Sequence, residues 1–290
     1  MKIKEYRTQF IADLTPIYDA GEAESFFYLI LEEKQKLKRI DLALQPDLFF
    51  SAAEIVVWNA FLEELKKEIP IQYVLGKTSF YGLDFEVNPH VLIPRPETEE
   101  LVNWILESCK SKGITQKIRI LDIGTGSGCI AISLAKNIPS AQVFALDVSD
   151  QALATAQRNE AINQVNVTFI NQNILEVLSL SAVEGLAQQL DIIVSNPPYV
   201  RNLEKEEIKK NVLDNEPHLA LFVADNDALI FYKKIAELAQ KNLTAKGLLF
   251  FEINQYLGAE TVALLEQLQF KNIELRKDIY GNDRMIRCAF

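Results

Sequence analysis

Histidine and cysteine are scarce in this chain of 290 residues. It has two histidines, His90 and His218, and three cysteines, Cys109, Cys129 and Cys288, with no Cys-x-x-Cys pair. Zinc sites and disulfide frameworks need such residues in closely spaced sets, so neither is expected and we predict no metal cofactor. Unpaired cysteines are usual in reducing compartments, and we therefore predict a cytoplasmic protein.

Long apolar runs and an excess of positive charge are also lacking. No stretch reaches the ~20 apolar residues of a membrane helix, and no signal peptide is evident at the N-terminus. Forty acidic residues outnumber 30 basic ones, for a formal net charge of −10. Nucleic acids are bound mainly through Lys and Arg, and the densest basic run, Lys34–Arg39, is typical of a solvated helix face. We expect no membrane or nucleic-acid partner, and a monomer.

The chain changes character near residue 75. Before it, apolar side chains recur at helical spacing, for example over residues 26–31 and 55–65, and no strand is evident. Ser51 can cap the second of these helices in a capping box with Glu54. The pattern predicts four or five packed helices as a domain of residues 1–75.

Residues 76–95 are predicted to connect this domain to a second one. Residues 78–87 are aromatic and β-branched around Gly82, a pattern that predicts a hairpin. The prolines that follow disfavour helix at the residue before each of them. We therefore expect an extended segment up to residue 95.

Strands and helices alternate over residues 96–290. Strands are predicted over residues 118–123, 142–147, 167–170, 191–195 and 248–253, and helices over 97–109, 129–136, 151–163 and 228–241. Such alternation is typical of an α/β protein with a doubly wound, mostly parallel sheet. Two final strands, near residues 272–277 and 284–289, are predicted to add an antiparallel hairpin to it.

The first strand of this second domain ends in a glycine-rich turn, Gly124-Thr125-Gly126-Ser127-Gly128. Glycines allow a backbone to approach a ligand closely. A dinucleotide fingerprint has glycine at positions one, three and six, whereas these glycines stand at one, three and five. Asp147 ends the next strand, where a carboxylate can accept hydrogen bonds from a ribose. With Asp122 before the turn, these features resemble class I S-adenosylmethionine methyltransferases over about residues 97–290.

The fourth strand runs into Asn196-Pro197-Pro198-Tyr199. Two prolines stiffen this corner and remove two N–H donors. Asn196 Oδ1 and the Pro197 carbonyl could each accept one hydrogen of a planar NH₂ group, and Tyr199 could lie against the face of that group. Positioning of this kind suits methyl transfer to an amide or amino nitrogen, and no strong general base is required before the transfer.

Several further motifs carry a more specific resemblance. They are Pro70-Ile71-Gln72-Tyr73-Val74-Leu75-Gly76, Ile93-Pro94-Arg95-Pro96-Glu97-Thr98-Glu99, Glu216-Pro217 and Asp278-Ile279-Tyr280-Gly281-Asn282-Asp283-Arg284. With Asn196–Tyr199, they closely resemble the HemK-type release-factor glutamine methyltransferases over nearly the whole chain. The resemblance implies that the substrate is the glutamine of the Gly-Gly-Gln loop in class I peptide-chain release factors. It also implies that the helical domain helps to hold the release factor.

The resemblance assigns site residues by position. S-adenosyl-L-methionine, which leaves as S-adenosyl-L-homocysteine, would contact the glycine turn (Gly124, Thr125, Gly126, Ser127 and Gly128), Asp147, Asn173, Ile174 and Asn196. Asn173 stands where the family more usually has Asp, at the border of the adenine. The substrate glutamine would enter at Asn196, Pro197, Pro198 and Tyr199. Arg95 and Glu97 either shape the entrance to the site or form a structural ion pair.

Four other functions compete with this one. A glutamine methyltransferase of a ribosomal protein would share the chemistry and differ in what the N-terminal domain recognises. An adenine-N6 methyltransferase of nucleic acid should carry a basic recognition region, which the net charge of −10 disfavours. A nicotinamide oxidoreductase would need glycine at the sixth position of the turn, which this sequence does not have. That function would also leave the Asn196–Tyr199 corner unexplained. A catalytically inactive binding module is disfavoured because every motif position of this sequence is chemically intact.

Overall fold

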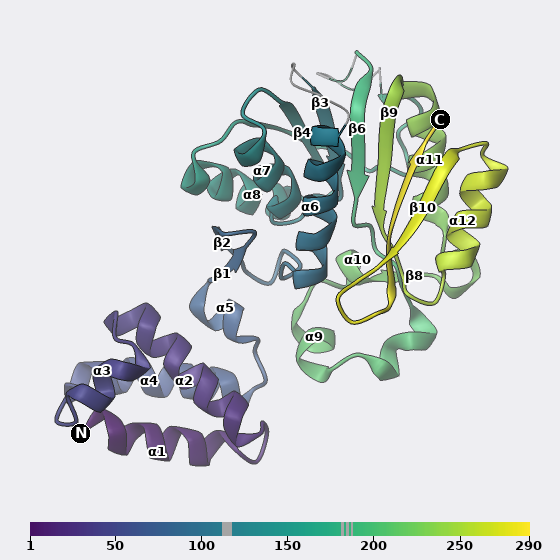
Figure 1. The fold of residues 1–290 in the computed structure, drawn as a ribbon. Coiled ribbons are helices and arrows are strands. Elements are labelled where there is room, and N and C mark those ends of the chain that lie inside the picture. Colours follow the sequence, from purple (N-terminus) through teal and green to yellow (C-terminus); the bar gives the residue numbers. More distant parts are fainter. Residues whose placement is uncertain (112–117, 181–182, 184–185, 187) are drawn as a thin grey trace. The chain divides into compact units, whose positions relative to one another are not determined.

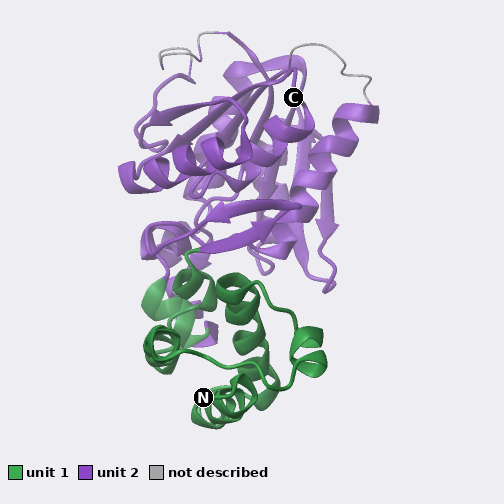
Figure 2. Ribbon diagram, turned by 90° about the vertical axis from the view of Figure 1, so that its left-hand side faces the viewer, with its two compact units in different colours: residues 1–76, 209–215 green, residues 77–208, 216–290 purple. Residues whose placement is uncertain are grey.

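The computed structural model describes residues 1–111, 118–180, 183, 186 and 188–290. The chain forms two compact units, which Figure 2 shows in different colours. The first contains residues 1–76 and 209–215, and the second contains residues 77–208 and 216–290. Within the described ranges, no helix combines the length and the apolar character needed to cross a membrane.

The first unit is built from helices. They are α1 (Ile3–Leu14), α2 (Ala20–Gln35), α3 (Arg39–Leu44), α4 (Ala52–Lys66), α5 (Ile71–Leu75) and α9 (Lys210–Asn215). The predicted capping box begins α4: Ser51 Oγ accepts from the Glu54 N–H, and the Glu54 carboxylate accepts from the Ser51 N–H. Both bonds satisfy N–H groups that a helix start leaves unpaired. Trp58 of α4 is fully buried and packs against the rings of Phe27 and Phe50.

The last helix of this unit comes from a distant part of the sequence. Lys210 Nζ of α9 lies 2.8 Å from the Glu68 carboxylate, and Asn215 Nδ2 donates to the Glu68 carbonyl. Residues 209–215 therefore belong to the helical unit although the chain around them belongs to the other. The sequence did not predict that residues 209–215 would pack with the helical domain.

The second unit contains a seven-stranded sheet in the order β10-β11-β9-β6-β3-β4-β5 (Figure 1). The strands are β3 (Arg119–Ile123), β4 (Gln142–Asp147), β5 (Val167–Asn171), β6 (Leu190–Ser195), β9 (Leu243–Glu252), β10 (Lys271–Lys277) and β11 (Asp283–Ala289). Neighbouring strands from β5 to β9 are parallel, whereas β11 pairs antiparallel with both β9 and β10. The predicted fold class, a mostly parallel sheet with an antiparallel C-terminal hairpin, is confirmed.

Helices cover both faces of this sheet (Figure 1). One buried cluster joins α6 (Pro96–Ser111) and α7 (Cys129–Asn137) to alternate strand residues such as Ile120 and Val194. A second cluster joins α11 (Ile230–Asn242) and α12 (Gly258–Gln267) to the intervening residues, such as Leu121 and Ile193. Successive side chains of a strand point to opposite faces, so the continuous apolar strands follow from burial on both sides.

The second unit contains four further features. The predicted hairpin is present as β1 (Lys77–Phe80) and β2 (Leu83–Glu86), joined by Tyr81 and Gly82 with positive φ angles. Helix α8 (Asp150–Asn163) is capped by Ser149, whose hydroxyl accepts from the Ala152 N–H. A short parallel pair, β7 (Val200–Arg201) and β8 (Phe222–Val223), and helix α10 (His218–Leu221) were not predicted.

The order of the strands places a crevice beside β3. The chain passes from β3 to β4 and β5 on one side, and β6 and β9 lie on the other. Ligands of open α/β sheets bind outside the carboxyl ends of the strands where the order reverses in this way. Ile123 is paired in register with Ser195, so the turn after β3 and the corner after β6 begin side by side.

Candidate functional site

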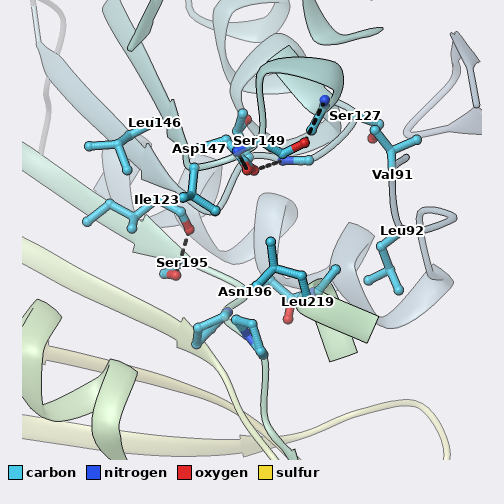
Figure 3. A pocket seen from close by; sticks show the side chains of 18 of the residues that line it. Val91, Leu92, Ile123, Ser127, Leu146, Asp147, Ser149, Ser195, Asn196 and Leu219 are labelled. Carbon is cyan, nitrogen blue, oxygen red and sulfur yellow. Dashed lines mark hydrogen bonds between the residues drawn. The ribbon is translucent and has the colours of Figure 1, made fainter. Parts of the chain in front are cut away.

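A pocket lies at the carboxyl ends of the parallel strands of the second unit (Figure 3). Its wall includes residues 123–127 at the end of β3, 146–149 at the end of β4, 172–175 after β5 and 195–198 at the end of β6. Residues 90–92, 94–95, 98, 217 and 219–220 and a few residues of α7, α8 and α11 complete it. The glycine turn and the Asn-Pro-Pro corner, which were predicted separately, therefore lie at the same pocket.

Asp147 holds the glycine turn in place. Its Oδ2 accepts from the Gly126 N–H at 2.8 Å, and its Oδ1 accepts from the Ser149 N–H at 2.9 Å. Gly124 and Gly126 have φ angles of +75° and +56°, which favour glycine. Burial raises the pKa of Asp147, while its backbone hydrogen bonds act in the opposite direction. Among the described residues, no Lys, Arg or His forms an ion pair with Asp147, so a bound ligand can meet its charge.

Gly128 has a different place from the other glycines of the turn. It is not among the residues of the pocket wall, and it precedes α7 with a φ angle of +82°. A Cβ on Gly128 would stand 2.9 Å from Ile132 Cδ1 and 3.1 Å from Ala156 Cβ. Its lack of a side chain therefore allows α7 and α8 to pack closely behind the turn.

We expect Gly128→Ala to lower the free energy of unfolding by more than Gly126→Ala does. Both positions have positive φ, which costs a non-glycine residue about 1–2 kcal/mol. Only Gly128 adds a steric overlap, because a Cβ at Gly126 would have no atom within 4 Å. Urea unfolding of the two variants without ligand checks this, and equal losses would contradict the packing role.

Asp122 lies behind the turn as a fully buried carboxyl group. Thr125 Oγ1 donates to its Oδ2 at 2.6 Å, which ties the turn to the end of β3. Burial raises the pKa of Asp122 to about 7, against the smaller opposing effect of the Thr125 hydrogen bond. The folded chain therefore holds a proton that the unfolded chain releases at lower pH.

This proton makes stability depend on pH. The contribution of protonated Asp122 is fully present below the unfolded pKa of about 4 and is lost as pH rises through the folded pKa of about 7. Relative to Asp122→Asn, the wild-type chain should lose roughly 1.4 kcal/mol of unfolding free energy per pH unit between pH 5 and 7. Urea titrations of both proteins at several pH values measure the difference, and parallel pH profiles would contradict it.

The Asn196–Tyr199 corner is fixed from two sides. Ser195 Oγ donates to the Ile123 carbonyl at 2.7 Å, which joins the ends of β6 and β3 (Figure 3). On the other side, Asn254 Nδ2 donates to the Tyr199 carbonyl at 2.9 Å. The Asn196 carbonyl oxygen stands 3.9 Å from where a Cβ on Gly124 would be. The corner therefore lies directly against the glycine turn.

The members of this corner differ in what they contact. Asn196, Pro197 and Pro198 line the pocket, and Tyr199 is not among its wall residues. The Tyr199 side chain packs against the buried cluster that includes residues of α11 and α12, and its hydroxyl donates to the Glu252 carboxylate at 3.2 Å. Burial moves the pKa of Tyr199 well above its ordinary value, so this hydroxyl remains protonated and donating.

Asn173 and Ile174 lie in the pocket wall after β5. Asn173 Oδ1 accepts from the Leu175 N–H, and its Nδ2 donates to the Glu176 carboxylate at 2.9 Å. The Asn173 side chain is thus engaged in its own turn, and Asn can build such a turn as Asp does.

Arg95 forms an ion pair at the side of the pocket. Its Nη2 lies 2.6 Å from Glu216 Oε1, and Glu216 Oε2 accepts from the Ile93 N–H at 3.0 Å. The Glu216 side chain is 1% exposed and that of Arg95 is 33% exposed. Glu216 thereby joins two segments of the pocket wall, residues 90–95 and 217–220. Arg95 therefore forms a structural ion pair, with Glu216 as its partner, and it lines the pocket. Glu97 is not among the wall residues.

Two buried polar residues next to Asn196 were missed from the sequence. Thr98 lines the pocket, and its hydroxyl donates to Glu252 Oε2 at 2.7 Å. Glu252 was detectable in principle, since it is the one charged residue in the apolar stretch Leu248–Ile253. A lone carboxylate in a strand buried on both faces must have polar partners, but the sequence does not name them.

Comparisons with known proteins identify the family. The chain is 61% identical over 290 residues to a release factor glutamine methyltransferase of Flavobacterium psychrophilum, covering 100% of both proteins. The chain belongs to the release factor glutamine methyltransferase family. A release factor glutamine methyltransferase of Bacteroides thetaiotaomicron is 43% identical over 98% of both chains. Residues 103–221 also match the methyltransferase small domain. Members of this family are methyltransferases that depend on S-adenosylmethionine, as the resemblance of the glycine turn indicated.

A solved structure of lower sequence identity supports the fold. The hMettl16 catalytic domain, crystallised in complex with the MAT2A 3'UTR hairpin 6, aligns with a TM-score of 0.54. The alignment covers 72% of the present chain and 76% of the hMettl16 chain, and the two are 17% identical in sequence. At this identity the likeness concerns the fold alone.

Proposed function

We propose that this chain transfers a methyl group from S-adenosyl-L-methionine to the side-chain amide nitrogen of a glutamine, the one in the Gly-Gly-Gln loop of class I peptide-chain release factors. The observation that carries the proposal is the meeting of the glycine turn and the Asn196 corner at one pocket. The full-length relationship to release factor glutamine methyltransferases supports the choice of substrate.

The residues of the pocket fit S-adenosyl-L-methionine. Gly126 leaves open space where a side chain would project, and Asp147 offers a half-buried carboxylate at the end of β4 that could accept from a ribose. Leu146 and Ile174 are apolar wall residues suited to an adenine ring. The ligand supplies a sulfonium methyl and leaves as S-adenosyl-L-homocysteine, and we propose that no metal takes part.

The Asn196 corner would prepare the substrate nitrogen. An amide nitrogen is a poor nucleophile because its lone pair is delocalised into the carbonyl group. Asn196 Oδ1 and the Pro197 carbonyl would accept the two hydrogens of the substrate NH₂, which raises electron density on nitrogen and holds it in line with the methyl group. Because the corner is already fixed by Ser195 and Asn254, this environment is preorganised.

Other parts of the chain would support the reaction without touching the transferred methyl group. We assign Tyr199 to holding the corner, in addition to any contact of its ring with the substrate amide. Pro198 and the wall held by Arg95 and Glu216 would border the substrate entrance. We further propose that the helical unit recognises the release factor and that the protein acts as a cytoplasmic monomer. The three cysteines are buried and none of them is joined in a disulfide, which agrees with a reducing compartment.

Mass spectrometry of a purified class I release factor tests this proposal. After incubation with the chain and S-adenosyl-L-methionine, we expect one added methyl group on the loop glutamine and none on a release factor with alanine at that position. A methyl group that appears only on ribosomal proteins or on adenine in nucleic acid would assign the chain to one of the competing functions.

A further inference from the structure

Behind Asn196, a chain of hydrogen bonds runs through the buried part of the second unit. Asn196 Nδ2 lies 3.4 Å from Thr98 Oγ1, and Thr98 Oγ1 lies 2.7 Å from Glu252 Oε2. On the other side of the same carboxylate, the Tyr199 hydroxyl lies 3.2 Å from Glu252 Oε1. Thr98 is 2% exposed and Glu252 is 1% exposed, so both are shielded from bulk solvent.

Arg284 sets the direction of these bonds at one end. Its Nη1 lies 3.4 Å from the Tyr199 hydroxyl, and its Nε donates to Asp278 Oδ2 at 3.0 Å. A guanidinium group donates and never accepts, so the Tyr199 oxygen receives a hydrogen from Arg284. The hydrogen of the Tyr199 hydroxyl is then directed to Glu252, which acts as an acceptor.

The same logic fixes the other end. Burial raises the pKa of Glu252, whereas its hydrogen bonds from Thr98 and Tyr199 and the charge of Arg284 favour the ionised carboxylate. An ionised carboxylate only accepts, so the one hydrogen of the Thr98 hydroxyl is used toward Glu252. Toward Asn196, Thr98 can therefore only accept, and the group of Asn196 that faces it must be the NH₂. The Asn196 oxygen is left as the atom that can face the pocket.

We propose that Thr98 and Glu252 are positioning residues that fix the orientation of the Asn196 amide, so that its oxygen faces the substrate NH₂. This inference rests on the proposed function of Asn196 as an acceptor for the substrate amide. An Asn amide turned by 180° would present its NH₂ to the substrate NH₂, two donors that cannot bond. The buried carboxylate thereby selects an amide substrate without contacting it.

Rates of methyl transfer to the release factor test the role of Thr98. Thr98→Val keeps the shape of the side chain and removes the hydroxyl, and we expect kcat to fall about 10- to 100-fold, the size of a misplaced reacting group. The dissociation constant of S-adenosyl-L-methionine should stay within about twofold, because Thr98 acts through Asn196, and Thr98→Ser should restore most of the rate. Glu252→Gln should lower kcat in the same way.

Thr261→Val is the matched control. Thr261 is also fully buried, and its hydroxyl donates to the carbonyl of Leu257, the residue before α12; Thr261 is not among the residues of the pocket wall. This variant should lose a similar amount of stability and keep its kcat. If Thr98→Val and Thr261→Val have the same kcat, Thr98 is a structural residue and the inference is wrong.

A change in substrate preference separates positioning from general damage. Wild-type protein should bind a release factor with glutamine in the loop more tightly than one with glutamate. In Thr98→Val the Asn196 NH₂ is free to turn toward a carboxylate, so the ratio of the two dissociation constants should fall at least about fivefold, a fraction of what one hydrogen-bond partner is worth. Equal weakening toward both loops would overturn the inference.

An NMR measurement on the Asn196 side chain tests the inference without the release factor. The side-chain NH₂ resonances of Asn196, assigned by their loss in Asn196→Ala, should show one hydrogen-bonded hydrogen in wild type and in Thr98→Ser. Thr98→Val should shift that resonance upfield. If wild-type protein transfers no methyl group to release factors but the resonance behaves in this way, the proposed substrate is wrong and the positioning of Asn196 stands. If the resonance does not change, the inference fails whatever the substrate is.

Discussion

Replacement of Asn196 by alanine should lower kcat by about 100- to 1,000-fold, the loss that follows removal of one preorganised polar group from an active site. Asn196 lines the pocket next to the glycine turn, and in the proposed reaction its oxygen accepts from the nitrogen that receives the methyl group. The affinity for S-adenosyl-L-methionine should change little. Steady-state kinetics and calorimetry measure the two effects separately.

A matched asparagine shows whether the loss is specific. Asn242 is buried, and its Nδ2 donates to the Leu238 carbonyl within α11. Asn242→Ala should cost stability and leave kcat near the wild-type value. The role given to Asn196 would be wrong if Asn196→Ala lost activity only through weaker binding of S-adenosyl-L-methionine.

Asp147→Ala should have the opposite kinetic signature. We expect binding of S-adenosyl-L-methionine to weaken by about 1.5–3 kcal/mol, the usual size for hydrogen bonds to a charged group, with a much smaller change in kcat at saturation. Part of the loss would come from the turn itself, because Asp147 also accepts from the Gly126 and Ser149 N–H groups.

Asp150→Ala is the control for charge near this site. Asp150 is exposed at the start of α8 and is not among the residues of the pocket wall. Calorimetric titrations should give the same affinity for this variant as for wild type. An unchanged affinity in Asp147→Ala as well would remove Asp147 from the binding of the ribose.

The parts of the site that the sequence predicted are those set by local chemistry. Apolar strands covered by helices on both faces are visible as continuous apolar runs, and their ends place Gly124 and Asn196 at one edge of a parallel sheet. That β6 lies beside β3, with Ile123 paired to Ser195, was not predicted and comes from the structure. This pairing brings the glycine turn and the Asn-Pro-Pro corner to one pocket.

The parts that were missed depend on contacts between distant residues. Asn196 and Thr98 are 98 positions apart, and Thr98 and Glu252 are 154 apart. A pattern of neighbours along the chain does not show which buried threonine meets which carboxylate. The same holds for α9, whose place in the helical unit depends on Glu68, 142 positions away from Lys210.

Gly128 and Tyr199 show a further limit of reasoning from motifs. Both belong to segments that meet the pocket, and neither is among its wall residues. Gly128 is needed by the packing of Ile132 and Ala156, and Tyr199 points its hydroxyl at Glu252. A motif therefore contains residues that touch a ligand together with residues that hold the others in place.

A crystal structure of the chain with S-adenosyl-L-homocysteine and a class I release factor would test the central claim most directly. We predict that the loop glutamine reaches the pocket, with its side-chain nitrogen about 3 Å from both Asn196 Oδ1 and the Pro197 carbonyl oxygen and open toward the sulfur atom. A glutamine bound elsewhere, or one whose nitrogen faces the NH₂ group of Asn196, would contradict the account.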